Sequence, residues 1–393
     1  MTIKNRWLLP EGIDEILPPQ AMQLELLCRR LLDLYTSWGY ELVMPPLIEY
    51  LDSLLTGTGE DLDLQTFKLT DQLSGRMMGV RADTTPQVAR IDVHNLKREY
   101  PTRLCYLGTV LNTRPYGPGG TRAPFQTGAE LYGYAGAESD AEILALMLKS
   151  LKLCDIRNVH VDLGHVGIYK ELVGGLALSS EQESILFNIL QRKAASELKS
   201  TLDNWAVPAD KAEFFYALIE LNGDIGVLDE ARKLLARAGS GIPACIDELA
   251  RIAELTTAQI RNAPLHFDLA ELRGYHYHTG MTFAAYIPEY GQGIAFGGRY
   301  DDIGRAFGQA RPATGFSTDI KTLFRLAPRQ NGRNKAIYAP SSALPGLQEM
   351  IDTLRGQGEI VINELPGQSG TPEAMGCDRR LVLEGGNWKV VRI

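Results

Sequence analysis

Two polar side chains on one predicted strand, Gln126 and Glu130, stand on either side of a glycine. Residues 125–134 follow a loop rich in glycine and proline, and the two-residue period of a strand puts both side chains, with Gly128 and Tyr132, on one face. A glycine in mid-strand weakens a sheet and often marks the close approach of a ligand or another backbone. The strand therefore predicts a binding face that offers an amide and a carboxylate. The alternative is a solvent-facing strand with a bulge at Gly128.

Two further polar residues lie at the predicted start of a helix, in the segment RADTTPQVARI (residues 81–91). Thr85 is a candidate N-cap, and Pro86 suits the first helical position. Asp83 and Thr85 then stand at the N-terminal end of the helix. Such an end helps to bind an anion, while the Asp83 carboxylate can hold an ammonium group. Simple capping of the helix is the alternative.

The elements before the Gln126 strand are expected to support it. Residues 104–111 form the first arm of a hairpin with it, and residues 40–50 predict a strand interrupted by two prolines. Because proline donates no backbone hydrogen bond, this strand must be an edge or a bent interface element. The other elements predicted in this part of the chain are an amphipathic helix over 19–38 and a hairpin over 65–70 and 76–81.

The rest of the chain alternates between helical and strand patterns. Residues 176–260 contain almost no strand signal, and we interpret them as a helical insertion. Hairpins or long excursions connect the strands, which favours an antiparallel sheet with helices packed around it over a doubly wound parallel sheet. Residues 328–393 begin with a polar linker and continue as a small module. The expected elements are helices at 139–153, 181–194, 210–220, 228–238, 245–254, 313–326 and 342–355, and strands at 158–169, 265–269, 274–287 and 293–303.

Composition indicates a globular protein of the reducing cytosol. The 393 residues allow two or three domains, and a hydrophobic fraction of 45% is enough for a core. A formal charge of −8 argues against broad binding to a nucleic-acid backbone. The five cysteines are scattered without metal-ligand spacing, so we expect core fillers rather than disulfides. No membrane span or secretory signal is evident, and we expect a cytoplasmic location.

Five segments, in order and at similar spacing, resemble class II aminoacyl-tRNA synthetases, and histidyl-tRNA synthetase in particular. The resemblance covers residues 1–327. It implies an α+β fold with a six-stranded antiparallel sheet flanked by helices, and a homodimer formed through Tyr40 to Tyr50. We expect a core in two parts, 1–175 and 261–327, the helical insertion 176–260 and a C-terminal α/β module, 328–393. The segments are PEGIDEILPP, RADTTPQVARI, the 103–134 hairpin, ELRGYHYHTG, and GGRYDDI with ATGF.

Positions that hold the amino acid in the synthetase are largely retained here. Asp83 stands where the family has a glutamate, and with Glu130 it would hold the ammonium group of histidine, while Arg273 would hold the carboxylate. His276 and His278 share one strand face, but no further ligand at suitable spacing is evident, and we expect neither a metal nor a cofactor. The implied amino-acid pocket comprises Asp83, Thr85, Gln126, Glu130, Arg273, Tyr275, Tyr277 and Tyr300.

The positions that grip ATP in the synthetase are changed. Two arginines of the family are missing, because Asn112 takes the first position and Lys321 and Thr322 stand in the region of the second. Losing one preorganised donor typically costs ~10²–10³ in rate, so two losses would cost ~10⁴–10⁶. The 66 residues after Ala327 are also fewer than the ~100–150 of a typical domain. We therefore expect neither adenylation nor tRNA binding.

This combination of retained and lost positions resembles the family of ATP phosphoribosyltransferase regulatory subunits. The family implies a noncatalytic partner of the short catalytic subunit, which performs the first step of histidine biosynthesis. It also implies feedback regulation with L-histidine as effector. Three alternatives stay open: an active histidyl-tRNA synthetase, a stand-alone histidine-binding sensor, and a structural remnant without a ligand.

Overall fold

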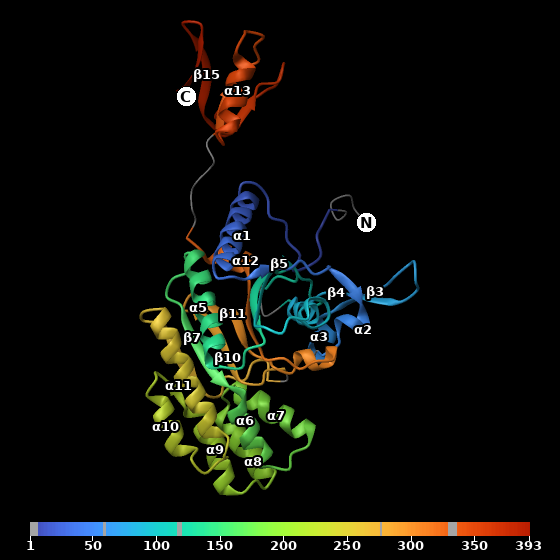
Figure 1. Cartoon of the computed structure of the whole chain (residues 1–393), viewed down its shortest axis with the longest axis vertical. Coiled ribbons are helices and arrows are strands. Elements are labelled where there is room, and N and C mark those ends of the chain that lie inside the picture. Colours follow the sequence, from blue (N-terminus) through green and yellow to red (C-terminus); the bar gives the residue numbers. More distant parts are fainter. Residues whose placement is uncertain (1–6, 58–59, 116–119, 276, 329–335) are drawn as a thin grey trace. The chain divides into compact units, whose positions relative to one another are not determined.

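A nine-stranded sheet is the centre of the first of two units (Figure 1). Its six middle strands, β5, β6, β12, β11, β10 and β7, are antiparallel throughout, which confirms the predicted six-stranded antiparallel sheet. Shorter strands extend both edges: β1 pairs in parallel with β5, and β9 and β8 follow β7. In spatial order the strands are β1 (Glu41–Leu42), β5 (Thr102–Thr109), β6 (Phe125–Tyr132), β12 (Ala313–Asp319), β11 (Tyr290–Arg299), β10 (Met281–Ile287), β7 (His160–His165), β9 (Leu265–Asp268) and β8 (Asn222–Gly223).

The computed structural model describes residues 7–57, 60–115, 120–275, 277–328 and 336–393. The first unit ends at Ala327 and the second begins at Pro328. In the part of the chain that is described, no helix has both the length and the apolar character needed to cross a membrane. All five cysteines are free thiols; four are buried and Cys245 is partly exposed.

Residues 40–50, predicted as a strand interrupted by two prolines, form two strands in different sheets. β1 lies at the edge of the nine-stranded sheet, whereas β2 (Ile48–Tyr50) belongs to a three-stranded antiparallel sheet. Pro45 and Pro46 lie between them, and their fixed φ and missing N–H groups prevent one continuous strand. The other two strands of the small sheet are β4 (Met77–Val80) and β3 (Phe67–Thr70), the second predicted hairpin.

The segment 313–326 is a strand followed by a helix, whereas the sequence pattern predicts one helix. β12 ends at Asp319, whose side chain accepts hydrogen bonds from the N–H groups of Lys321 and Thr322 and so caps α12. Tertiary pairing overrides the helical spacing, because β12 is held on both sides by β6 and β11.

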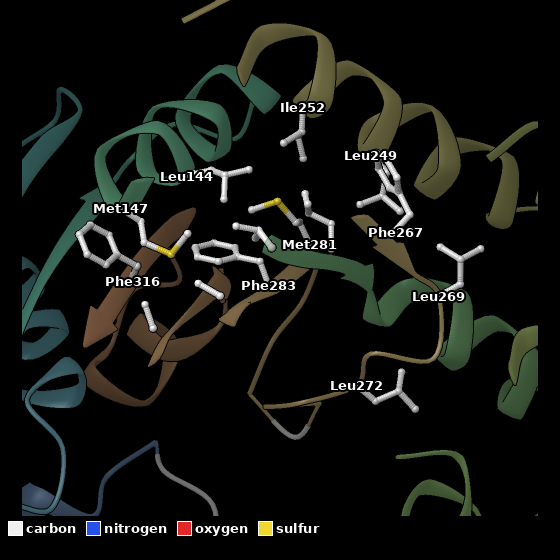
Figure 2. Close-up of a cluster of buried hydrophobic side chains, with 14 of the residues drawn as sticks. Leu144, Met147, Leu249, Ile252, Phe267, Leu269, Leu272, Met281, Phe283 and Phe316 are labelled. Atoms are coloured by element: carbon white, nitrogen blue, oxygen red, sulfur yellow. The ribbon is translucent and has the colours of Figure 1, made fainter. Parts of the chain in front are cut away.

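Helices cover one face of the nine-stranded sheet. Figure 2 shows Leu144 and Met147 of α5 and Ile252 of α11 above Met281 and Phe283 of β10, all of them buried. α11 packs against both α5 and β7, so its apolar side chains belong to the same core. The helices on this face are α1 (Gln20–Ser37), α5 (Ala137–Leu153), α11 (Ile242–Gln259) and α12 (Ile320–Leu326).

The opposite face of the sheet carries a smaller apolar cluster and the candidate site. Ala129 and Leu131 of β6 point into the helix-covered core, so Gln126, Gly128 and Glu130 face the other way. The elements on this second face are α4 (Thr85–Arg90), the π-helix η2 (Ile91–Leu96) and the 3-10 helix η3 (Ile303–Phe307). Two short helices, α2 (Leu51–Leu54) and α3 (Glu60–Gln65), precede β3.

The segment between β7 and β9 is almost entirely helical. The sequence pattern predicts four of its helices and misses α6 and α8. No glycine or proline marks the turn between α7 and α8. Lys193 adopts a φ of 50° at this turn. The Lys193 ammonium group lies 2.7 Å from the Asp268 carboxylate. The helices are α6 (Val166–Gly174), α7 (Ser180–Gln191), α8 (Ala195–Asn204), α9 (Ala209–Glu220), α10 (Val227–Leu234) and the core helix α11.

The second unit combines a four-stranded sheet with one helix. β13 has β14 and β15 as parallel neighbours, and β16 pairs antiparallel with β15. Ile337, Ile351 and Leu381 lie in its buried core. The elements are β13 (Ala336–Ala339), α13 (Leu347–Gly356), β14 (Val361–Asn363), β15 (Cys377–Glu384) and β16 (Asn387–Arg392).

Candidate functional site

The start of α4 is bonded to the side chain of Gln126 on β6. Gln126 Nε2 donates to Asp83 Oδ1 at 2.8 Å, and Gln126 Oε1 accepts the Thr84 N–H at 3.0 Å. Asp83 Oδ1 also accepts the Thr85 N–H at 3.2 Å. The amide thus ties the helix start to the sheet, and three predicted site residues meet in one cluster.

The N-cap of α4 is Thr84, not the predicted Thr85, and Thr84 makes no side-chain capping bond. The helix begins at Thr85, whose hydroxyl is directed to the sheet. Thr85 Oγ1 donates to Glu130 Oε1 at 3.2 Å and lies 3.4 Å from the Tyr106 hydroxyl. Helix capping alone therefore does not account for Thr85, because its hydroxyl serves a carboxyl group on the neighbouring strand.

Glu130 is a buried carboxyl group that is only half satisfied. The residue is 1% exposed, and its Oε2 has no hydrogen-bond partner among the described residues. Burial, followed by the nearby charge of Asp83, raises the pKa of Glu130 well above its ordinary value. A buried polar atom without a partner costs about 1–3 kcal/mol and is uncommon in native proteins. A donor that carries positive charge would relieve both the missing bond and the uncompensated charge.

Glycines form the sheet surface beneath this carboxyl group. Glu130 faces Gly315 of β12 in the strand register, and Gly315 faces Gly298 of β11. A Cβ at position 315 would overlap both Glu130 Oε2 and the Tyr300 hydroxyl. The Tyr300 hydroxyl is also buried without a partner in the described structure. Two unsatisfied oxygens thus converge over one glycine, and a larger residue would displace them.

Gly128 is buried, and the strand around it is regular. β6 pairs without interruption with β5 on one side and β12 on the other, which excludes a solvent-facing strand with a bulge. A Cβ at this position would overlap the hydroxyl of Tyr106, so the glycine makes room for that ring. Sequence reasoning misses Tyr106 as a neighbour of the site. Alternation along β5 does not reveal it, because Tyr106 meets Gly128 only through the register of β5 and β6.

Arg273 lies on the same face of the sheet, over β10 and β11. Its guanidinium carbon is 5.3 Å from the centre of the Tyr286 ring and 5.4 Å from that of Phe296, both cation–π distances. Phe296 faces Ser317 of β12, which in turn faces Gly128. The arginine and the Glu130 cluster therefore share one surface, with an acidic and a cationic region about two strands apart.

Of the remaining two predicted residues, Tyr275 is directed towards α6 and α7, whereas the Tyr277 ring lies 4.5 Å from the ring of His278, which stacks near Tyr300. Tyr275 packs edge-on against Tyr169 of α6, with ring centres 4.9 Å apart, and its hydroxyl donates to Glu183 of α7. Tyr277 is 53% exposed. His276 lies outside the described residues. Within the described ranges, no group of three or more His, Cys, Asp or Glu side chains is placed to hold a metal ion.

Side chains at the predicted nucleotide positions are engaged within the protein or uncharged. Lys321 Nζ donates to Asp14 Oδ1 at 3.0 Å, and the Thr322 hydroxyl donates to Asp319 Oδ2 at 2.6 Å. Asn112 is buried among its neighbours. None of these three side chains offers the planar, bidentate fork with which arginine binds phosphate. The site therefore presents groups suited to an amino acid and lacks arginine at the two predicted triphosphate positions.

The fold and the cluster define a protein of the class II aminoacyl-tRNA synthetase type. Residues 12–323 match the family model described as histidyl-tRNA synthetase. A crystal structure from Bacillus halodurans, described as an ATP phosphoribosyltransferase regulatory subunit/histidyl-tRNA synthetase, matches with a TM-score of 0.85 and 26% identity over 95% of this chain and 97% of that chain. The histidyl-tRNA synthetase of Nostoc sp. matches with a TM-score of 0.81 over 98% and 97%; at 16% identity it supports the fold alone.

Residues 334–391 match a second model, the ATP phosphoribosyltransferase subunit HisZ C-terminal domain. The ATP phosphoribosyltransferase regulatory subunit of Thioalkalivibrio sulfidiphilus is 58% identical to this chain over 98% of each. That of Nitrosococcus oceani is 54% identical over 100% of this chain and 98% of its own. The chain belongs to the family of ATP phosphoribosyltransferase regulatory subunits.

Proposed function

We propose that this chain binds L-histidine in the pocket around Glu130 and adjusts the activity of the short catalytic subunit of ATP phosphoribosyltransferase. Its role as a noncatalytic regulatory subunit in histidine biosynthesis follows from the family to which it belongs. To that role we add L-histidine as the effector, the pocket that binds it and feedback regulation.

The observation that carries the proposal is the half-satisfied carboxyl group of Glu130. Its Oε2 and the Tyr300 hydroxyl converge over Gly315, and both lack a partner among the described residues. An α-ammonium group has three donors and a positive charge, so it can bond both oxygens and compensate the carboxylate. Each charge-assisted hydrogen bond contributes about 1.5–3 kcal/mol.

Arg273 and Asp83 complete the grip on an amino acid. Arg273 stands on the same sheet face, and its guanidinium fork matches a carboxylate geometrically. Asp83 is held beside the cluster by Gln126 and adds a second acidic group near the ammonium position. The ligand that fits two acids and one cation on one surface is a free amino acid.

The same chain lacks two arginines expected for charging tRNA, and its net charge is unfavourable for binding tRNA. Asn112 and Thr322 replace the expected arginines, and the Thr322 hydroxyl is held by the cap of α12. A net charge of −8 is unfavourable for binding a long phosphate backbone. We infer that neither adenylation nor tRNA binding is part of its function.

Calorimetry and activity assays test the proposal together. The purified protein is expected to bind L-histidine and to show neither phosphoribosyl transfer nor histidine-dependent ATP–pyrophosphate exchange. Added to the short catalytic subunit, it is expected to switch on phosphoribosyl transfer and make it sensitive to histidine. A clear exchange signal would instead indicate a synthetase, and no histidine signal would place the effector site elsewhere.

We also propose a homodimer formed through residues Tyr40 to Tyr50. Tyr40 anchors this segment, because its buried hydroxyl donates to Glu142 Oε1 at 2.9 Å. The segment then exposes several large apolar side chains, which favours a subunit contact over a solvated edge. They are Leu42, Met44, Leu47, Ile48 and Tyr50.

Light scattering after gel filtration tests the dimer. Met44 is 81% exposed, and Met44→Asp is expected to give a monomer because a charge cannot be buried in an apolar contact without a partner. Leu73→Asp is the matched control, since Leu73 is 98% exposed on the turn between β3 and β4. An unchanged dimer mass for the Met44 variant would contradict the proposed interface.

A further inference from the structure

The second unit holds a crevice at the carboxyl ends of two parallel strands. β13 and β14 run in parallel, and α13 connects them. The crevice has a volume of about 370 Å³, within the ~300–1,000 Å³ that is typical of small-molecule sites. In open α/β sheets, ligands bind outside the carboxyl ends of the strands. The walls are residues 340–344 after β13, the start of α13, and Asn363 and Glu364 at the end of β14.

The loop between β13 and α13 is held at two points. The Ser341 N–H donates to Glu364 Oε2 at 2.8 Å, and Nε1 of Trp388 on β16 donates to the Pro345 carbonyl oxygen at 3.1 Å. Gly346 enters α13 with a φ of 80°, which residues with a side chain rarely adopt. These bonds lie within the protein itself, so the shape of the crevice does not depend on a ligand.

Glu364 is an ionised acceptor at the mouth of the crevice. The Ser341 N–H, followed by the Tyr338 hydroxyl, lowers the pKa of Glu364 below its ordinary value. A carboxylate has about four acceptor positions, so these two donors leave others for a ligand. In nucleotide-binding βαβ units, an acidic residue about 20 residues after the loop bonds the ribose hydroxyls. Glu364, directly after β14, occupies the corresponding place.

The crevice is not built for phosphate. Among the described residues that line it, none is Lys or Arg. Arg355 bonds the Val361 carbonyl and the Asn363 side chain instead. The loop, PSSALPG, has the single glycine Gly346 where phosphate-binding loops have several, and Glu349 adds negative charge to the first turn of α13. The ligand that suits this surface is therefore a sugar without a phosphate group.

Apolar side chains line the crevice beside the polar ones. Leu347 and Ile351 are one turn apart on α13 and both are buried, while Leu344 on the loop is 50% exposed. Together they offer a surface on which a planar ring can pack, and a purine has a larger apolar face than a pyrimidine.

We propose that this crevice binds a purine nucleoside, with the ribose hydroxyls on Glu364 and the base against Leu344 and Leu347. The inference is independent of the proposed histidine pocket, because every residue that it uses belongs to the second unit. The ribose hydroxyls would donate to the carboxylate, so a nucleoside that lacks one of them should bind more weakly.

Calorimetry on the full chain, with adenosine, guanosine, 2′-deoxyadenosine and AMP, provides the test. We expect the wild type to bind adenosine roughly 5- to 20-fold more tightly than 2′-deoxyadenosine. Glu364→Gln removes the charge while its amide oxygen can still accept from Ser341, and should reduce that preference to about twofold or less. The matched control is Glu384→Gln, which alters an exposed carboxylate at the end of β15 and should keep the preference.

Three outcomes would overturn the inference. The first is binding of neither adenosine nor guanosine by the wild type, and the second is equal affinity for adenosine and 2′-deoxyadenosine; neither measurement depends on the folding of a variant. The third is AMP binding about tenfold or more tighter than adenosine, which would indicate a phosphate site. L-Histidine titrated into the same wild-type protein tests the proposed function separately, so the failure of one proposal leaves the other standing.

Discussion

Replacing Glu130 by glutamine removes a buried charge and keeps the shape of the side chain. The pKa of Glu130 is raised by burial and by Asp83, so the folded protein holds a proton that the unfolded chain releases. The contribution of this group to stability is therefore most favourable at low pH and is lost as the pH rises above its ordinary value of 4.5 and through the raised value. We expect Glu130→Gln to unfold at a higher temperature than the wild type at alkaline pH, and the difference to shrink on acidification.

The same substitution should lower the affinity of the protein for L-histidine. Loss of one charge-assisted hydrogen bond of about 1.5–3 kcal/mol raises Kd by roughly 10- to 150-fold. Wild-type binding should also release a proton, because the ammonium group requires the carboxylate form of Glu130. Its affinity should then increase with pH, and Glu130→Gln should abolish that dependence. Calorimetry in two buffers of different ionisation enthalpy measures the released proton directly.

Glu142→Gln is the control for this prediction. Glu142 bonds Arg103 at 2.7 Å through both carboxylate oxygens and has no role in the pocket. We expect that variant to lose thermal stability and to bind histidine as the wild type does. If Glu130→Gln were less stable than the wild type at every pH and bound histidine equally well, the idea of an uncompensated carboxyl group awaiting a cation would be refuted.

Three further substitutions probe the frame of the site. Gly315→Ala should abolish the histidine signal in calorimetry while circular dichroism stays native, because its Cβ would overlap Glu130 Oε2. Arg299→Met should lower stability by about 3–5 kcal/mol in urea unfolding, since it leaves the fully buried Asp140, 2.8 Å from Arg299, without its cation. Asp319→Ala should cost about 1 kcal/mol in the same assay, because it removes the cap of α12.

The acidic cluster could be predicted from the sequence because its geometry is local. Two-residue alternation fixes which side chains of β6 share a face, and Pro86 marks the helix start that carries Asp83 and Thr85. The resemblance of separate motifs then brings these segments together. Only the N-cap is displaced, by one residue, which is the usual uncertainty of a helix boundary.

The remainder of the site depends on strand register, which the sequence does not show. Gly315 and Gly298 stand beneath Glu130 only because β12 and β11 pair in one alignment. The direction of Tyr275, towards α6 and α7, is set by packing against Tyr169.

The proposed loss of the nucleotide groups and retention of the amino-acid groups would have a common physical explanation. Catalysis of adenylation needs groups that stabilise charge developing on phosphate, whereas regulation needs only a ligand that binds two states with different affinity. A buried carboxyl group whose pKa is raised and whose Oε2 has no partner among the described residues differs energetically from one bonded to an ammonium group. A regulatory coupling of about 1–3 kcal/mol is no larger than the contribution of one such charge-assisted bond. The free energy of one such bond at Glu130 is therefore large enough to couple ligand binding in the proposed pocket to the state of a partner subunit.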